Sequence, residues 1–439
     1  MAVSARVLLV GREDTLIGPL ADGLDRLGWR SITARGPYAA TTALTDLQIE
    51  AAIIDSATTE DAPGLAQRLK TAVHPRRFPI IAIADPATAP VEAFDLTLAA
   101  PLHPAQAAMR LDSLVRAAIA EEELELRQAT FTERGKRLAS PSVGKSKTRI
   151  LAVGEPAPKF LGLSNALKAA GAEVVGAFTA YTAFDYLHEK GFDAVVLWAG
   201  DNQQEALSIA AGMRRNTRLY HVPTLLCLGH GNTVSLAEAY HRGVSDIAAP
   251  DTPDDQTAAR VLELARAFRL QNAVRQTLET TRTSGLMDVG TGLFSRDVFA
   301  AHLSRLAKAS QVKGRPLSIC VLRIAESAEL ARARAGGWIE RATPQIGSMI
   351  GRLVRTEDTA ARLAPEVFAL ALPATPAAAA RASAERIAAV IACTAFESGE
   401  GNPPFVVDFD IGVAQVEAGE TAGRTLERAA AQSLQKKAG

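Results

Sequence analysis

The residues with the clearest chemical potential are an arginine and an aspartate three positions apart, Arg355 and Asp358, which form the only Arg-x-x-Asp in the sequence. A guanidinium fork can pair with phosphate oxygens or with the O6 and N7 acceptors of guanine. A carboxylate can accept hydrogen bonds from the N–H groups of guanine. Residues three apart near a turn can present both groups on one side. The alternative is an ordinary surface ion pair, which contributes little to stability.

A second motif follows this pair after five intervening residues and leads into the apolar, strand-like run Ala369–Leu372. Its five residues are Ala364, Pro365, Glu366, Val367 and Phe368. The layout resembles the GGDEF domain of diguanylate cyclases. In that family Arg-x-x-Asp is the inhibitory site that binds the product, and a Gly-Gly-Asp/Glu-Glu-Phe hairpin is the active site. Residues 288–296 and 411–414 also resemble the family's opening motif and late strand, so we expect a GGDEF-type domain to the C-terminus.

The resemblance also locates the catalytic positions, and most of them are altered. The family's metal-binding aspartate falls on Arg323, and the second acidic residue of the signature falls on Val367. Glu366 alone is a poor Mg²⁺ site, because hard cations need several oxygen ligands. Pro365 fixes φ and lacks an N–H donor, and Ala364 adds a methyl group where the family has glycine. We therefore expect no cyclase activity, no catalytic residue, no bound metal and no required cofactor: the chain is predicted not to be an enzyme.

The same resemblance implies a ligand, cyclic di-GMP, at Arg355 and Asp358. A further arginine of the following helix joins this site in the family, and by register it is Arg386, with Arg381 as the alternative. The prediction is a non-catalytic cyclic di-GMP receptor that changes its protein contacts on binding. An alternative hypothesis is that this part of the chain is a residual cyclase or a GTP-binding domain.

Upstream of this domain, short apolar strands alternate twice with amphipathic helical stretches, which predicts two parallel sheets covered on both faces. The predicted strands are residues 7–10, 51–54, 80–83 and 96–98, then 150–153, 194–197, 224–227 and 246–248. Both units resemble response-regulator receiver domains. The fold class is thus α/β, with two flavodoxin-like receiver domains (parallel doubly wound sheets) followed by a GGDEF-type α/β domain with a mixed, mainly antiparallel sheet.

Receiver chemistry needs a phosphoacceptor aspartate, an acidic pair that holds Mg²⁺ and a lysine. In the first unit Asp55 matches the acceptor, but Gly11-Arg12 stands at the acidic pair and Ala100 at the lysine. In the second unit the acceptor position is Trp198, which cannot take a phosphoryl group. A second alternative hypothesis is therefore that the chain is a phosphorylation-responsive regulator that acts through Asp55.

Three further groups of residues are relevant to these hypotheses. Glu13 and Asp14 lie close to the altered acidic pair and could hold a metal in a shifted geometry. In receiver-bearing cyclases a ligand dimer can bridge the inhibitory site to an arginine elsewhere, and Arg214 and Arg215 are the residues proposed for that role. The acidic run Glu121–Glu123 is most simply a solvated helix face.

At 439 residues the chain holds about three domains. Its 48 basic and 48 acidic residues cancel, so no bulk charge attracts nucleic acid or a membrane surface. Its 3 cysteines lack metal or disulfide spacing, and no apolar run suffices to span a bilayer, so we expect a cytoplasmic protein. The expected domains are a first receiver (1–134), a linker (135–147), a second receiver (148–268), a helical stalk (269–285) and the GGDEF-type domain (286–439).

Two observations predict protein partners: an apolar stripe on a helix and the family resemblance. Val261, Leu264 and Phe268 form an apolar stripe that predicts a homodimer held mainly by the receiver units. Resemblance to cyclic di-GMP effectors with this domain order implies adaptor proteins of the ClpXP protease pathway, a role in the cell cycle and placement at a cell pole.

Overall fold

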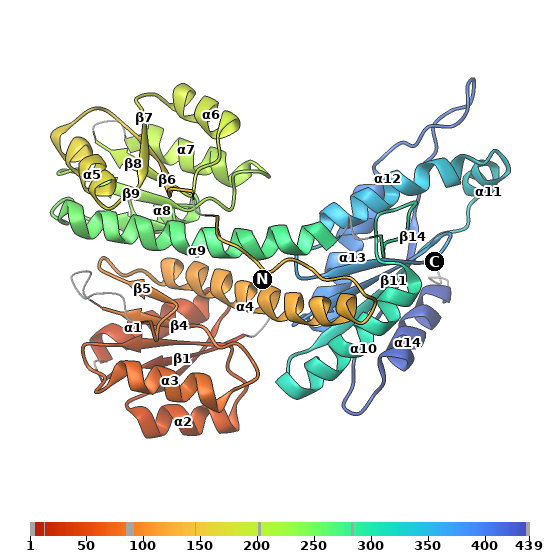
Figure 1. Cartoon of the computed structure of the whole chain (residues 1–439), viewed down its shortest axis with the longest axis horizontal. Coiled ribbons are helices and arrows are strands. Elements are labelled where there is room, and N and C mark those ends of the chain that lie inside the picture. Colours follow the sequence, from red (N-terminus) through yellow and green to blue (C-terminus); the bar gives the residue numbers. More distant parts are fainter. Residues whose placement is uncertain are drawn as a thin grey trace. The chain divides into compact units, whose positions relative to one another are not determined.

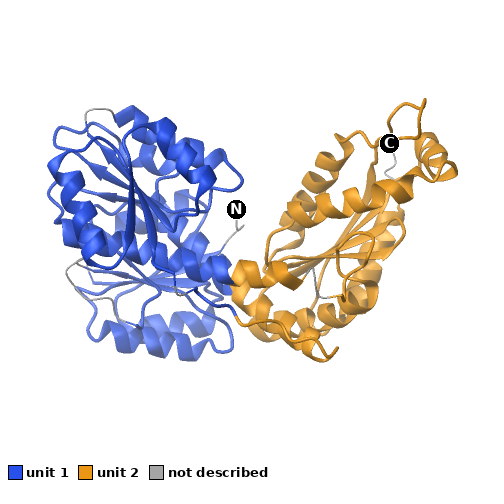
Figure 2. Cartoon of the chain, turned by 45° about the horizontal axis from the view of Figure 1, so that its top comes forward, with its two compact units in different colours: residues 1, 3–118, 141–273 blue, residues 2, 119–140, 274–439 orange. Residues whose placement is uncertain are grey.

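The computed structural model describes residues 5–12, 14–84, 92–144, 146–200, 203–281 and 285–435. These residues form two compact units (Figure 2). Unit 1 comprises the described parts of residues 3–118 and 141–273, and unit 2 those of 119–140 and 274–439. Two long helices, α4 (Pro104–Thr132) and α9 (Asp254–Thr280), each contribute residues to both units. None of the helices in these ranges is both long and apolar enough to cross a membrane.

The first half of unit 1 is a parallel sheet with strand order β2-β1-β3-β4-β5 (Figure 1). Its central strands are continuous apolar runs because helices cover both faces, and β3 and β4 are buried along their whole length. The elements are β1 (Arg6–Val10), α1 (Asp14–Arg26), β2 (Arg30–Ala34), α2 (Pro37–Asp46), β3 (Ala51–Asp55), α3 (Ala62–Ala72), β4 (Ile80–Ile83), β5 (Leu96–Leu98) and the start of α4. The sheet is flavodoxin-like, as predicted.

The second half of unit 1 repeats this topology, since its parallel strands run in the order β7-β6-β8-β9-β10. The elements are β6 (Arg149–Val153), α5 (Pro158–Ala169), β7 (Glu173–Ala177), α6 (Ala180–Glu189), β8 (Ala194–Ala199), α7 (Gln203–Arg215), β9 (Thr224–Leu228), α8 (Leu236–His241), β10 (Asp246–Ala248) and α9. The predicted repeat of the flavodoxin-like sheet is therefore confirmed.

A buried ion pair lies where the two halves of unit 1 meet. Arg260 on α9 contacts Asp246 on β10 through its Nε at 3.0 Å and its Nη2 at 2.5 Å. The first half adds Gln106 Nε2, which donates to Asp246 Oδ1 at 2.6 Å, and the Ala100 carbonyl, which accepts from Arg260 Nη1 at 3.3 Å. The pair thus joins α4 and the segment after β5 in the first half to β10 and α9 in the second half.

The apolar stripe on α9 is already used within the chain. Val261 and Leu264 are buried in a core cluster with Ile150 of β6 and Leu163 of α5. Phe268 is half-buried. The stripe therefore covers its own sheet rather than offering a face to a second copy. The homodimer stays a prediction, but without this stripe as its basis.

Unit 2 is built on a four-stranded sheet of order β12-β13-β11-β14, in which each neighbouring pair is antiparallel. Its strands are β11 (Leu317–Ile324), β12 (Thr359–Ala364), β13 (Val367–Pro373) and β14 (Phe409–Gln415); its helices are α10 (Arg296–Lys313), α11 (Ala328–Ala335), α12 (Trp338–Leu353), α13 (Ala377–Ala392) and α14 (Ala422–Leu434). An isolated parallel bridge joins Phe294 to Ala361. This sheet fits the GGDEF-type domain that was expected.

We predict that Arg260→Ala destabilises unit 1 by about 3–5 kcal/mol, because it leaves the Asp246 carboxylate buried without its cation. Urea denaturation of the full chain, followed by circular dichroism, measures the effect. Arg68→Ala is the matched control, since its pair with Asp61 is exposed, with 54% and 61% of the side chains accessible, and it should cost less than about 0.5 kcal/mol. Equal midpoints for the two variants would contradict the prediction.

Candidate functional site

Arg355 and Asp358 lie together in the turn between α12 and β12. The Arg355 backbone N–H donates to Asp358 Oδ2 at 2.9 Å, and the Asp358 N–H donates to the Arg355 carbonyl at 3.1 Å. Asp358 is buried, with 9% of its surface exposed, whereas Arg355 is exposed. The aspartate therefore closes the turn with its own side chain. The structure brings the two predicted residues together, with a fixed carboxylate and an arginine that extends outward.

The structure distinguishes the two arginines that were proposed to join this turn. Arg386 on α13 donates through Nη2 to the carbonyl of Leu353 at 3.4 Å, two residues before Arg355. Arg381, on the same helix, instead donates to Gln432 Oε1 of α14 at 3.4 Å. Both side chains are exposed. Arg386 is thus the arginine with a contact to the chain that enters the turn.

The signature hairpin connects β12 to β13, and its carboxylate is engaged by an arginine that the sequence did not single out. Arg334 on α11 donates through Nε to Glu366 Oε1 at 2.7 Å, and its Nη2 pairs with the other oxygen. The same guanidinium contacts both oxygens of Glu326 at 2.7 and 2.8 Å. Hydrogen bonds that the Arg334 guanidinium donates to Glu366 and Glu326 raise the pKa of Arg334. Ala364, Pro365 and Glu366 thus belong to a hairpin whose acidic group is already paired.

Arg323 lies near the end of the central strand β11, beside this hairpin. In the antiparallel register it lies between Val367 of β13 and Asp410 of β14. Its Nε is buried and has no hydrogen-bond partner among the described residues. No group of three or more His, Cys, Asp or Glu residues in that part of the chain could hold a metal ion. A guanidinium beside an ion-paired Glu366 does not fit a Mg²⁺ site, which needs several free oxygens. The absence of a metal requirement stays a prediction.

The predicted phosphoacceptor, Asp55, ends β3 and is buried, with 2% of its surface exposed. Its Oδ2 accepts a hydrogen bond from Thr58 Oγ1 at 2.5 Å, and its Oδ1 accepts one from the Ala57 N–H at 3.1 Å. Thr58 Oγ1 in turn accepts from the Arg12 N–H at 3.1 Å. Glu13 and the side chain of Asp14 lie outside the described residues. The carboxylate is therefore held in a local turn, and phosphorylation at Asp55 stays a prediction.

The corresponding position of the second sheet, Trp198, is packed against a glycine. Gly154 has φ of +148°, and a Cβ built on it would approach the Trp198 Cβ to 2.5 Å, so only glycine fits. Arg214 and Arg215 lie in the last turn of α7 in unit 1. Their proposed role at a ligand bound to unit 2 stays a prediction.

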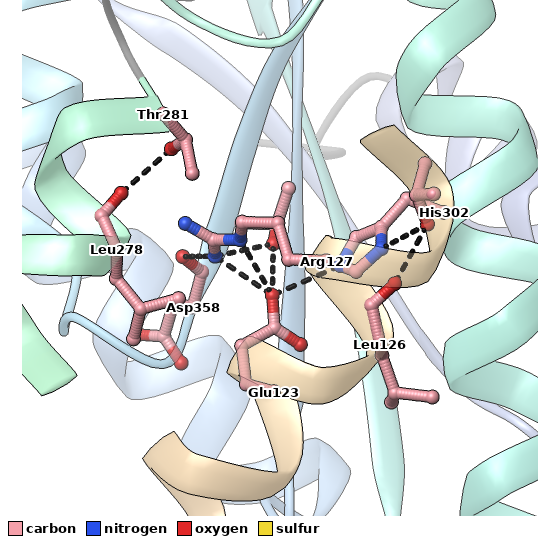
Figure 3. A network of polar contacts seen from close by, with 9 residues as sticks. Glu123, Leu126, Arg127, Leu278, Thr281, His302 and Asp358 are labelled. Carbon is pink, nitrogen blue, oxygen red and sulfur yellow. Dashed lines mark hydrogen bonds and ion pairs between the residues drawn. The ribbon is translucent and has the colours of Figure 1, made fainter. Parts of the chain in front are cut away.

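A buried polar network connects α4 to the Arg355–Asp358 turn (Figure 3). Glu123 Oε1 contacts Arg127 Nε and Nη2 at 3.0 and 2.7 Å, His302 Nε2 at 2.9 Å and Thr359 Oγ1 at 3.1 Å. Arg127 Nη2 also donates to the Asp358 carbonyl at 3.4 Å. The prediction of a solvated face for Glu121–Glu123 is wrong here, because only 1% of Glu123 is exposed. The i, i+4 spacing of Glu123 and Arg127 amid apolar residues was the available signal.

The charge of Glu123 is stabilised by its partners. Burial by itself raises the pKa of this carboxyl, but the positive charges of His302 and Arg127, with their hydrogen bonds, outweigh burial and lower the pKa to about 2. A buried carboxylate of this kind is stable only while its cationic partners remain in place. The network is therefore a structural constraint on the turn that begins β12.

Comparisons with known proteins show that most of unit 2 is similar to GGDEF domains. Residues 285–439 match the family model "Diguanylate cyclase, GGDEF domain". The response regulator PleD of Caulobacter vibrioides (strain NA1000 / CB15N) is 24% identical over 238 residues, which cover 54% of this chain and 52% of PleD. PleD of strain ATCC 19089 / CIP 103742 / CB 15 matches equally. The chain thus spans about half the length of the curated relatives that it matches.

Solved structures of GGDEF proteins are also similar. The GGDEF domain of DgcB from Caulobacter crescentus, in complex with c-di-GMP, is 23% identical with a TM-score of 0.31, covering 34% of this chain and 84% of that one. Diguanylate cyclase SiaD of Pseudomonas aeruginosa, in complex with its activator SiaC, is 25% identical with a TM-score of 0.33, covering 40% of this chain and 67% of that one.

The family match corrects one prediction. We expected the chain not to be an enzyme, because Arg323 and Val367 replace carboxylates of the family. The matching model describes diguanylate cyclases, and the family therefore points to enzymatic activity. The error arose because two altered ligand positions were weighed above the similarity of the whole domain.

The shifted pKa of Glu123 predicts a specific loss of stability in acid. Its pKa in the folded protein, about 2, lies below its ordinary value of 4.5. The stabilisation is therefore fully present above about pH 4.5 and is lost as the pH falls toward 2, amounting to roughly 3 kcal/mol. Glu123→Gln should flatten this part of the pH profile of urea denaturation. Glu125→Gln, exposed on the same helix, is the control and should keep the wild-type slope; identical slopes for all three proteins would refute the assignment.

Proposed function

We propose that unit 2 binds cyclic di-GMP at the turn formed by Arg355 and Asp358. The observation that carries this proposal is the geometry of the turn: the Asp358 carboxylate is fixed on the Arg355 backbone, while the Arg355 side chain is exposed. Support also comes from the GGDEF family match of residues 285–439 and from DgcB, whose similar domain is in complex with c-di-GMP.

The chemistry of the three residues suits this dinucleotide. Cyclic di-GMP carries two phosphates and two guanine edges. Arg355 supplies a planar fork for guanine O6 and N7 or for phosphate oxygens, and Asp358 supplies an acceptor for guanine N–H groups. Arg386, which contacts the Leu353 carbonyl, adds a second cation beside the turn. Two cations and one oriented carboxylate therefore complement an anionic guanine ligand.

Binding at the turn does not depend on what the hairpin does. The turn precedes β12 and the hairpin follows it, and the strand Thr359–Ala364 separates them. Six strand residues at about 3.3 Å each span roughly 20 Å. The two positions are therefore distinct sites, and the proposal holds whether or not the domain converts GTP. Incubation with GTP and Mg²⁺ or Mn²⁺ measures turnover separately.

The wider role is part of the same proposal. We infer that bound cyclic di-GMP alters protein contacts of the chain, with a homodimer, adaptor proteins of the ClpXP pathway and a cell-pole location as the expected setting. Phosphorylation at Asp55 is the alternative input. Acid-labile phosphate on purified protein after treatment with acetyl phosphate would support that alternative.

We predict that Arg355→Ala weakens cyclic di-GMP binding by roughly ten-fold to several hundred-fold, because one or two charge-assisted hydrogen bonds of ~1.5–3 kcal/mol are lost. Asp358→Ala should cost less and relax the preference for guanine. Arg386→Ala should have an intermediate effect. Isothermal titration calorimetry with cyclic di-GMP, GTP and GDP measures each affinity.

Arg381→Ala is the matched control for Arg386→Ala, since both arginines are exposed on α13 but Arg381 contacts Gln432 instead. It should bind like the wild type. Thermal unfolding without ligand should change little for Arg355→Ala and Arg386→Ala, whose arginines are exposed. Wild-type affinity in Arg355→Ala would reject the proposed site, and unfolding of that variant would favour a purely structural ion pair.

A further inference from the structure

We propose that Arg127 is a positioning residue for the ligand: it holds the main chain of Asp358 from outside the GGDEF-type fold. This inference rests on the proposed binding of cyclic di-GMP at the turn. Arg127 belongs to α4, a single helix that starts at Pro104, directly after the first receiver-like sheet. A residue 231 positions away in sequence therefore acts on the ligand site.

The contact of Arg127 is with the backbone and the strand start rather than with the ligand. Its Nη2 donates to the Asp358 carbonyl at 3.4 Å and to Thr359 Oγ1 at 3.1 Å. The guanidinium is 5% exposed and lies over the ring of Phe294, with 5.3 Å from its Cζ to the ring centroid. One arginine thus fixes the last residue of the turn and the first residue of β12.

Arg127 is itself held on the opposite side. Glu123 Oε1 accepts from two of its nitrogens, and His302 of α10 and Thr359 of β12 contact the same oxygen. His302 is fully buried, and its Nδ1 lies 3.0 Å from Thr130 Oγ1 of α4. Because every member contacts at least one other, the guanidinium has little freedom to leave the Asp358 carbonyl.

The consequence for binding is pre-organisation. Within the turn, Asp358 is held by its side chain on the Arg355 N–H and by its own N–H on the Arg355 carbonyl, and Arg127 holds its carbonyl from α4. Removal of the Arg127 contact leaves part of the turn to be ordered by the ligand, which costs conformational entropy on binding. We therefore expect a loss of affinity of roughly ten-fold, which corresponds to about 1.4 kcal/mol.

The experiment compares three variants of the full chain by calorimetry with cyclic di-GMP. Arg127→Ala should bind roughly ten-fold more weakly than the wild type, and Arg127→Lys should fall between them, since an ammonium keeps the charge near Glu123 but loses the fork. Arg315→Ala is the matched control. Arg315 is equally buried and pairs with Glu122, the neighbouring residue of α4, at 2.8 Å, so its loss tests destabilisation of the same helix.

Arg315→Ala should keep wild-type affinity while it lowers the unfolding midpoint. If Arg127→Ala and Arg315→Ala weaken binding equally, the effect is general destabilisation and the inference fails. Should Arg127→Ala not fold, Arg127→Lys carries the test, and wild-type affinity in that variant overturns the inference. Absence of binding by the wild type would instead reject the proposed function.

A double-mutant cycle separates positioning from simple loss of stability. If Arg127 acts by positioning the Asp358 carboxylate through its main chain, then Arg127→Ala should weaken binding much less in the Asp358→Ala background than in the wild type, because that carboxylate is absent there. Effects that multiply independently would show that Arg127 does not act through Asp358. The cycle needs only the ratio of four dissociation constants for cyclic di-GMP.

Discussion

The buried carboxylate of Glu123 is the constraint on which the Arg355–Asp358 turn of unit 2 depends. A charge without water is costly unless opposite charge and hydrogen bonds surround it. The Oε1 atom of Glu123 contacts Arg127 of α4, His302 of α10 and Thr359 of β12. The positions of these three elements are therefore coupled, and the turn that begins β12 takes its orientation from them.

The two ends of β12 differ chemically because a different arginine forms hydrogen bonds at each end. At its start, Arg127 holds the backbone of the turn, and the exposed Arg355 extends outward. At its end, Arg334 pairs with both oxygens of Glu366. The proposed ligand would therefore meet a turn that is already ordered, whereas a metal or nucleotide at the hairpin would compete with the Arg334 guanidinium for Glu366. The same strand supports both positions without making them one site.

In unit 1, the two residues that sequence resemblance predicted at phosphoacceptor positions, Asp55 and Trp198, close a turn and pack beside a glycine. Asp55 accepts hydrogen bonds from Thr58 and Ala57, and the indole of Trp198 packs beside Gly154. A buried polar contact of the unit is instead the Asp246–Arg260 pair, to which Gln106 on α4 of the first half adds a hydrogen bond. Burial of that pair joins the two sheets through contacts that need no phosphate.

The sequence alone determined the strands and the turn, because both are local. Continuous apolar runs such as Ile80–Ile83 require a sheet buried on both faces, and three-residue spacing brings Arg355 to Asp358. Only the tertiary structure decided which charges are buried. The sequence predicted a solvated Glu123, but α10 and β12 pack against it in the folded chain. The pairing of Arg334 with Glu366 joins residues that are 32 positions apart. Such contacts depend on where distant elements meet, which no local pattern specifies.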